Sequence, residues 1–231
     1  MIRCPACLEN TNDFLHLDSG RLKKYLAYSQ DYYDGMFHKY LDILKPELNK
    51  CKCGHVFYKN MPSDDILSEM YSFEKEYLNN PARPPSQDMV QTMKKCFSII
   101  GKKNPCILDY GAGHGRWSNA ASIAGFKVVA YEPHASRTVE DNNYELALSE
   151  EDIPPYKFDL IWLEQVMEHV KDPYVLLQDV KKYTHKDTIL RLSVPNINRA
   201  KEGNEIWHQW PYNGKSNHTL APYQHLQGFT Q

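Results

Sequence analysis

The chain has 231 residues, of which 42% are hydrophobic and 24% are charged, and its formal net charge at pH 7 is -2. This length accommodates one full α/β domain with a small module beside it. The near-neutral balance argues against a nucleic-acid partner, because phosphate binding normally requires an excess of Lys and Arg. No apolar run approaches the about 20 residues of a membrane span, and the N-terminus lacks a signal-peptide pattern, so we expect a cytoplasmic protein.

Four of the six cysteines form two pairs near the N-terminus. Cys4 and Cys7 lie in a C-P-x-C sequence, and Cys51 and Cys53 lie in K-C-K-C-G-H. In a reducing compartment such pairs indicate a metal site, and four thiolates suit a tetrahedral structural zinc ion. We therefore predict a zinc ion bound by all four cysteines. Because a C-x-C spacing is less usual than C-x-x-C, His55 is an alternative to Cys53 as the fourth ligand.

The segment between the two cysteine pairs is long for a zinc ribbon and rich in tyrosine. It contains Tyr25, Tyr28, Tyr32, Tyr33 and Tyr40. One interpretation is a lid that binds an acceptor molecule, but we favour amphipathic packing against the larger domain. Residues 1–60 are thus predicted to form a zinc-binding module with a tyrosine-rich insertion.

A helical linker is predicted over residues 61–85. Ser63 is placed to cap a helix whose first turn holds two acidic residues, and apolar residues follow at helical spacing. The proline-rich run 79–87 is the best candidate for a domain boundary, so the second domain is predicted to cover residues 86–231. Its first element is a helix that begins near Asp88 and ends at Gly101.

The stretch ILDYGAGHGRW, residues 107–117, is the most informative part of the sequence. Two apolar residues followed by alternating glycines predict a buried strand that turns sharply into a helix, with glycine where the backbone approaches a ligand. A dinucleotide-binding fingerprint would require a third glycine where this chain has Arg116. The carboxylate of Asp109 would also repel a pyrophosphate.

A cationic ligand suits this turn better than a dinucleotide does. S-adenosylmethionine carries a sulfonium and an amino group that an acid at the strand end attracts, and its carboxylate would bind open backbone amides of the turn. A second strand over residues 127–131 leads to Glu132, about 20 residues beyond the turn, where a carboxylate accepts both ribose hydroxyls. A third strong strand, FDLIWLEQVMEHV over residues 158–170, breaks into a helix at 164–169.

Together these three segments resemble the class I S-adenosylmethionine-dependent methyltransferases. The matching motifs are LDYGAGHG, VAYEP and FDLIWLEQVMEHV, and the resemblance covers roughly residues 86–230. It implies a Rossmann-like fold and a cofactor site made of Asp109, Gly111, Ala112, Gly113, Glu132, Pro133, Glu164 and Gln165. It also implies that Ser149 and Glu150 lie near the adenine ring.

Methyl transfer needs little covalent help, because the sulfonium is already a good leaving group. A general base is required only when the acceptor is a hydroxyl or an acidic carbon. His169 is the first candidate for that role, followed by His208, His218 and His225. The alternative is that His169 only orients its loop.

Helices and strands alternate through the rest of this domain. We expect a helix over 136–143, a short strand over 144–148, a helix over 175–183 and a strand over 188–196. This alternation indicates an α/β fold with a doubly wound, mostly parallel sheet and a ligand outside the carboxyl ends of its strands.

The sheet of the resembled family ordinarily has seven strands, whereas the composition after the fifth predicted strand is typical of loops. Strands 6 and 7 are therefore predicted to be missing, which leaves a five-stranded sheet. We expect its apolar edge to be covered by a second copy of the chain, as a homodimer, or by residues 196–231.

A zinc ribbon ahead of such a domain resembles bacterial methyltransferases that tailor sugars, polysaccharides and secondary metabolites. The resemblance implies a small-molecule or carbohydrate acceptor. A ribosomal-RNA guanine methyltransferase is an alternative that Cys51, His55 and Phe57 would allow, although the long gap after Cys7 and the acidic balance count against it. A non-catalytic module that binds zinc and a cofactor is a third possibility, against which the intact glycine and acidic positions argue.

Overall fold

The computed structural model describes residues 2–11, 14–15, 17–73, 84–133, 143–198, 209–213 and 216–230. The chain divides into two compact units, and each of them is discontinuous in sequence. The cysteine unit comprises Met1–Met70, Met167–Leu176 and Val194–Gln231. The sheet unit comprises Tyr71–Val166 and Leu177–Ser193. Within the described ranges, every helix is too short or too polar to cross a bilayer.

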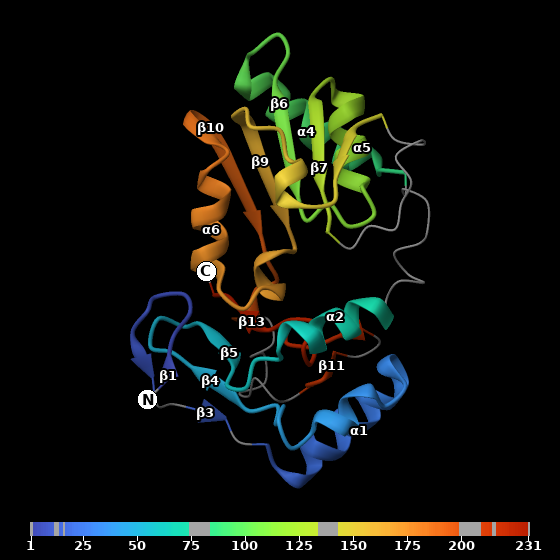
Figure 1. Cartoon of the computed structure of the whole chain (residues 1–231), viewed down its shortest axis with the longest axis vertical. Coiled ribbons are helices and arrows are strands. Elements are labelled where there is room, and N and C mark those ends of the chain that lie inside the picture. Colours follow the sequence, from blue (N-terminus) through green and yellow to red (C-terminus); the bar gives the residue numbers. More distant parts are fainter. Residues whose placement is uncertain are drawn as a thin grey trace. The chain divides into compact units, whose positions relative to one another are not determined.

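The sheet unit is built on five parallel strands (Figure 1). Their spatial order is β10-β9-β6-β7-β8, and every neighbouring pair is parallel. The strands are β6 (Cys106–Tyr110), β7 (Lys127–Tyr131), β8 (Glu145–Ala147), β9 (Phe158–Glu164) and β10 (Thr184–Ser193). The central strands are continuous apolar runs, as expected where both faces of a parallel sheet are covered. This architecture confirms the predicted Rossmann-like α/β fold and the predicted number of strands in its sheet.

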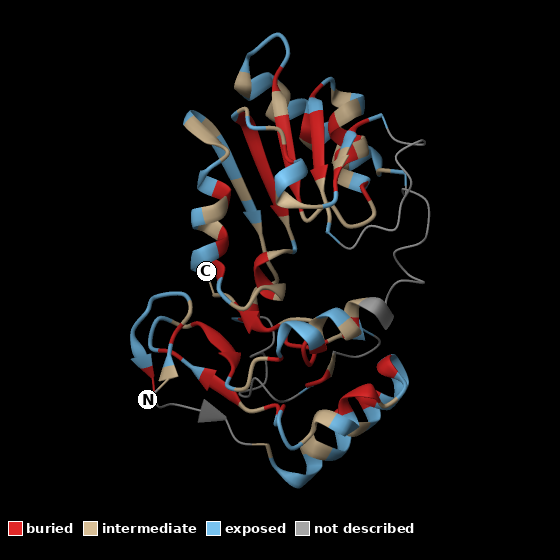
Figure 2. Cartoon of the chain, in the orientation of Figure 1, coloured by how far each residue is buried: buried red, intermediate tan, exposed pale blue. Residues whose placement is uncertain are grey.

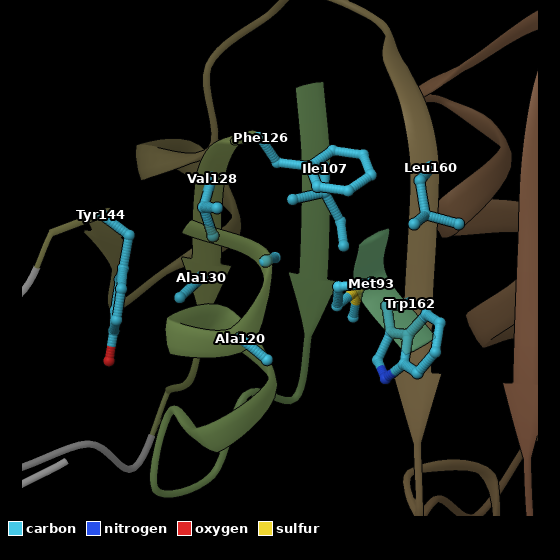
Figure 3. Close-up of a cluster of buried hydrophobic side chains, with 10 residues drawn as sticks. Met93, Ile107, Ala120, Phe126, Val128, Ala130, Tyr144, Leu160 and Trp162 are labelled. Carbon is cyan, nitrogen blue, oxygen red and sulfur yellow. The ribbon is translucent and has the colours of Figure 1, made fainter. Parts of the chain in front are cut away.

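Two helices pack their apolar residues on one face of the sheet. They are α4 (Gln87–Ile100) and α5 (Arg116–Ala124), and the labelled side chains in Figure 3 come from these helices, the sheet and nearby loops. The buried members of this core are Met93, Ile107, Ala120, Ala121, Phe126, Val128, Ala130, Tyr144, Leu160 and Trp162. Figure 2 shows the buried residues concentrated in β6, β7 and β9. Each fully buried aliphatic or Phe side chain contributes about 1.5–3 kcal/mol to this unit.

The boundaries of several elements follow from local signals in the sequence. The Ser86 side chain accepts a hydrogen bond from the backbone N–H of Met89 at the start of α4, and Gly101 ends the helix with φ +66°. The helix α6 (Pro173–Lys181) and the short strand β8 lie where they were predicted. In contrast, β10 starts four residues before its predicted range, at Thr184. The helix predicted over 136–143 falls almost wholly outside the described residues.

The cysteine unit contains a four-stranded antiparallel sheet in the order β13-β5-β4-β3. Its strands are β3 (Phe14–Leu15), β4 (Leu48–Lys50), β5 (Val56–Tyr58) and β13 (Gln227–Gly228), and two further pairs are β1 (Ile2–Arg3) with β2 (Asn10–Thr11) and β11 (Tyr212–Asn213) with β12 (Ser216–Asn217). The helices of this unit include α1 (Ser19–Tyr33) and α2 (Asp64–Phe73). The Ser63 hydroxyl accepts from the backbone N–H of Ile66 at 3.4 Å, so the predicted cap is present.

The tyrosine-rich insertion forms an aromatic core with residues near the C-terminal end of the sequence. The Tyr25 ring stacks on the Trp210 ring, with centroids 6.0 Å apart. The Trp210 indole N–H donates to the backbone carbonyl of Leu220 at 2.8 Å, and the Tyr58 hydroxyl donates to the same carbonyl at 2.6 Å. The insertion therefore packs as an aromatic core within the cysteine unit.

The compact units of the structure divide the chain differently from the predicted domains. Residues 86–231 were assigned to one domain, whereas the segments Met167–Leu176 and Val194–Gln231 belong to the cysteine unit. The reason is that β13 adds to the edge of β5, and the backbone N–H of Tyr58 donates to the carbonyl of Leu226 at 3.0 Å. Pairing between strands so distant in sequence leaves no local signal.

The outer strand β10 presents apolar side chains to solvent. Ile189, Leu190 and Leu192 are 38%, 42% and 44% exposed. The described part of the C-terminal segment contributes β13 to the sheet of the cysteine unit. Covering of β10 by residues 196–231 stays a prediction, as does its covering by a second copy of the chain.

Candidate functional site

The glycine turn lies between β6 and α5 at the carboxyl edge of the sheet. Gly111 and Gly113 adopt φ values of +78° and +49°, in the left-handed region that favours glycine. A Cβ atom on Gly111 would lie 2.6 Å from Cγ2 of Val166, so close packing also requires glycine there. A Cβ atom on Gly113 would meet nothing within 4 Å, which leaves open space beside the turn.

The backbone amides of the turn are engaged within the protein. The N–H groups of Gly111 and Ala112 both donate to the carbonyl of Tyr131, at 2.8 and 2.9 Å. The N–H group of Gly113 donates to Oε2 of Glu132 at 2.8 Å. The expectation that these amides are open to a ligand carboxylate was therefore wrong. They fix the turn against the end of β7 instead.

Glu132 lies beside the turn, as its predicted role requires. Its own backbone N–H donates to the carbonyl of Ala147 at 3.0 Å, which links the end of β7 to β8. Its side chain is half-buried, and the next residue, Pro133, is exposed. A carboxylate has about four lone-pair sites, so one hydrogen bond from Gly113 leaves capacity to accept hydroxyl groups.

Asp109 is almost fully buried, with 2% of its surface exposed. Its Oδ2 atom accepts a hydrogen bond from the Ser118 hydroxyl at 2.6 Å. This bond ties the end of β6 to α5 and holds a negative charge beneath the turn. Ser118 was not predicted, although a serine in the helix that follows an acid-glycine turn is a natural partner for that acid.

Glu164 and Gln165 join the end of β9 to β10. The Glu164 carboxylate forms an ion pair with Arg191 and accepts from the Ser193 hydroxyl at 3.1 Å. The backbone N–H of Gln165, a residue with φ +56°, donates to the carbonyl of Ser193 at 2.8 Å. The Arg191 guanidinium also lies 4.0 Å from the centroid of the Trp162 ring. Arg191 and Ser193 were not predicted, because their partners lie on a neighbouring strand.

The two candidates for the adenine edge also have local partners. Oε1 of Glu150 accepts from the Tyr110 hydroxyl at 2.7 Å, so this loop is fastened to the end of β6. The Ser149 side chain and backbone both bond the Asp152 carboxylate, in a capping box for the short helix η3 (Glu150–Asp152).

The glycine turn and Glu132 lie where open α/β sheets usually bind ligands. From β6 the chain moves outward through β7 to β8 and then crosses to β9 on the other side of β6. Strand order thus reverses at β6, and ligands bind beside the carboxyl ends of the strands at such a switch point. The residues at the ends of β6, β7 and β9 surround this point.

The four N-terminal cysteines meet in the cysteine unit. The Sγ atoms of Cys4 and Cys53 are 3.9 Å apart, and those of Cys7 and Cys51 are 3.6 Å apart. All four lie within 4.8 Å of one another. Tetrahedral zinc with Zn–S bonds of about 2.3 Å requires S···S separations of about 3.8 Å, so the cluster fits the ion. Burial raises the pKa of the Cys4 thiol to about 12, and a bound cation would favour its thiolate.

His55, the alternative ligand, has a different partner. Its Nε2 atom lies 2.8 Å from Oε1 of Gln227, and its ring contacts the Phe229 ring with centroids 4.8 Å apart. Burial lowers the pKa of His55, which favours its neutral form. The structure thus groups the four cysteines without His55.

His169 belongs to the cysteine unit, whereas the glycine turn belongs to the sheet unit. It lies in the short helix η4 (Met167–His169) and contacts His225, with ring centroids 4.8 Å apart. His218 is buried, and its Nδ1 atom accepts from the backbone N–H of Leu220 at 3.0 Å. His208 lies outside the described residues.

Comparison with curated proteins finds relatives that match part of the chain. The ubiquinone biosynthesis O-methyltransferase of Actinobacillus pleuropneumoniae serotype 5b is 30% identical over 141 residues, covering 54% of this chain and 57% of the relative. The protein of the same name from Haemophilus ducreyi is 32% identical over 145 residues, covering 54% and 56%. The chain therefore spans little more than half the length of these relatives.

Among solved structures, a SAM-dependent methyltransferase from Archaeoglobus fulgidus has a TM-score of 0.39 at 15% identity, covering 55% of this chain and 58% of the other. Coclaurine N-methyltransferase bound to N-methylheliamine and SAH has a TM-score of 0.43 at 12% identity, covering 90% and 67%. A family model described as a methyltransferase domain matches residues 85–231, which is more than half of the sequence. The chain therefore belongs to the methyltransferase-domain family.

Proposed function

We propose that this protein is an S-adenosylmethionine-dependent methyltransferase that methylates a small molecule. The observation that carries the proposal is the hydrogen bond of 2.8 Å from the Gly113 amide to Glu132. It holds a half-buried carboxylate beside the glycine turn, next to the open space at Gly113, at the switch point of the sheet. This combination suits a ligand with a ribose and a positive charge.

S-adenosylmethionine would supply an activated methyl group on its sulfonium. Toward this cofactor Glu132 would accept the ribose hydroxyls, and the carboxylate of Asp109 would attract the amino group. The same carboxyl edge of the sheet also carries Pro133, Glu164 and Gln165. Glu164 acts mainly through its ion pair with Arg191, which keeps the ends of β9 and β10 together.

The proposed acceptor is a small molecule with a hydroxyl group. The curated relatives are named as O-methyltransferases, which favours transfer to a hydroxyl group of a small molecule. Carbohydrates are hydroxyl-rich acceptors of the same chemistry. The formal net charge of -2 does not favour ribosomal RNA.

Zinc bound by the four cysteines is the second part of the proposal. The separations of 3.6 and 3.9 Å between paired Sγ atoms support it. Cys4 and Cys51 are buried, while Cys7 and Cys53 are exposed. With all four coordination positions filled by cysteines, the ion would have a structural role.

Calorimetry with the whole chain tests the cofactor assignment directly. S-adenosylmethionine and its demethylated product should bind, whereas NAD should not. Incubation with labelled S-adenosylmethionine and a panel of phenols, nucleotide sugars and RNA would then identify the acceptor class. A chain that binds NAD and neither sulfur compound would refute the proposal.

A further inference from the structure

A second group of side chains with metal-binding chemistry lies apart from the cysteines. Glu168 and His169 lie on η4, and His225 lies near the C-terminal end of the sequence. A carboxylate oxygen and one ring nitrogen from each histidine lie within 4.8 Å of one another. The segments are held together by the backbone N–H of Leu226, which donates to the Glu168 carbonyl at 2.7 Å. All of these residues belong to the cysteine unit.

Glu168 is the unusual member of this group. Its exposed fraction is 0%, and neither carboxylate oxygen has a hydrogen-bond partner among the described residues. A buried, unpaired carboxylate is costly, and buried polar groups in proteins nearly always have a partner. A bound cation would give the Glu168 carboxylate the partner that it lacks among the described residues.

The two histidines are oriented as metal ligands usually are. Nδ1 of His225 bonds the backbone carbonyl of Thr219 at 2.9 Å, and His169 bonds the backbone of Gln224. One nitrogen of the His225 ring is therefore held by the backbone, which leaves its Nε2 atom for another partner. Imidazoles that bind metals typically donate their second N–H to such a carbonyl, which fixes the ring and its tautomer.

We propose that Glu168, His169 and His225 bind a divalent first-row transition-metal ion. Two imidazole nitrogens and one carboxylate suit zinc, iron or cobalt, whereas magnesium and calcium prefer oxygen ligands alone. Three protein ligands leave at least one coordination position open. The ion offsets the buried charge of Glu168 and links η4 to the C-terminal segment. This site is separate from the cysteine cluster and does not depend on the proposed methyl transfer.

Cobalt(II) distinguishes the two sites, because thiolate ligands give an intense sulfur-to-cobalt charge-transfer absorption that nitrogen and oxygen ligands do not. The full-length chain would be stripped of metal and titrated with cobalt, and the bound ion would be counted by elemental analysis. We expect two ions per chain in the unaltered protein. Cys4→Ser should lose the charge-transfer absorption and keep one ion bound without thiolate.

Glu168→Gln and His225→Gln should each bind one ion fewer while the thiolate absorption stays unchanged. His218→Gln is the matched control, because it replaces a buried histidine of the same unit outside the group, and it should still bind two ions. Without metal, Glu168→Gln should melt no lower than the unaltered protein, since it removes an unpaired buried charge. A single ion with only thiolate character in the unaltered protein, or two ions in both Glu168→Gln and His225→Gln, would overturn the proposal.

Discussion

Replacing Glu132 by alanine is the sharpest test of the cofactor site. The change removes the acceptor of the Gly113 amide and the proposed acceptor of the ribose hydroxyls. Hydrogen bonds to a charged group contribute about 1.5–3 kcal/mol each, but a half-buried carboxylate competes with water, so we expect a loss of about 1–3 kcal/mol in binding free energy. This loss corresponds to an increase in Kd of about 5- to 150-fold.

Calorimetric titration with the demethylated cofactor measures this change without the need for an acceptor. Glu132→Gln keeps a neutral acceptor for the Gly113 amide, so its Kd should fall between those of the unaltered protein and Glu132→Ala. Glu145→Gln, at an exposed position on the neighbouring strand β8, should bind like the unaltered protein. An unchanged Kd in Glu132→Ala, in a protein that unfolds like the unaltered one, would remove Glu132 from the site.

Three further predictions address packing, charge and metal. Gly111→Ala should lower the free energy of unfolding by about 1–3 kcal/mol, because φ is +78° and the new Cβ would lie 2.6 Å from Val166. In a double-mutant cycle, adding Val166→Ala should recover part of that loss, and strictly additive free energies would contradict the clash. Ser118→Ala should cost about 1–3 kcal/mol in denaturant unfolding, since it removes a hydrogen bond to the buried carboxylate of Asp109; an unchanged midpoint would show that the bond is unimportant. Cys4→Ser, or treatment with a chelator, should release zinc and loosen the cysteine unit, while binding of the demethylated cofactor persists. Elemental analysis measures the zinc and hydrogen exchange measures the loosening; retention of zinc by Cys4→Ser would contradict the ligand set.

The sheet unit was largely predictable because its signals are local. The apolar run of β9, the glycine turn and the helix end at Gly101 each depend on residues close together in sequence. The position of Glu132 followed from the regular length of a strand-helix-strand unit. What the sequence could not show is that the turn's amides bond Tyr131 and Glu132, because these bonds depend on how two neighbouring strands are aligned.

The cysteine unit was predictable only in part. The spacing of the cysteines indicated a metal cluster, and the fold brings their sulfur atoms together. In contrast, the partners of Tyr25 in the insertion include Trp210 and Tyr223, and the side chain of Glu168 lies near His225. Contacts between such distant segments leave no periodic pattern, so a single sequence does not show that these residues lie together.

The pairing of β5 with β13 also constrains when this protein can fold during synthesis. His55 and its partner Gln227 are separated by 172 positions in the sequence. At about 5–20 residues per second, a ribosome needs about 10–30 s to make the chain between them. Throughout that time the edge of β5 and the aromatic side chains of the insertion lack their final partners, and an exposed strand edge is prone to pair with other chains. Early metal binding by the four cysteines, all made within the first quarter of the sequence, would give the nascent chain an ordered element during this interval.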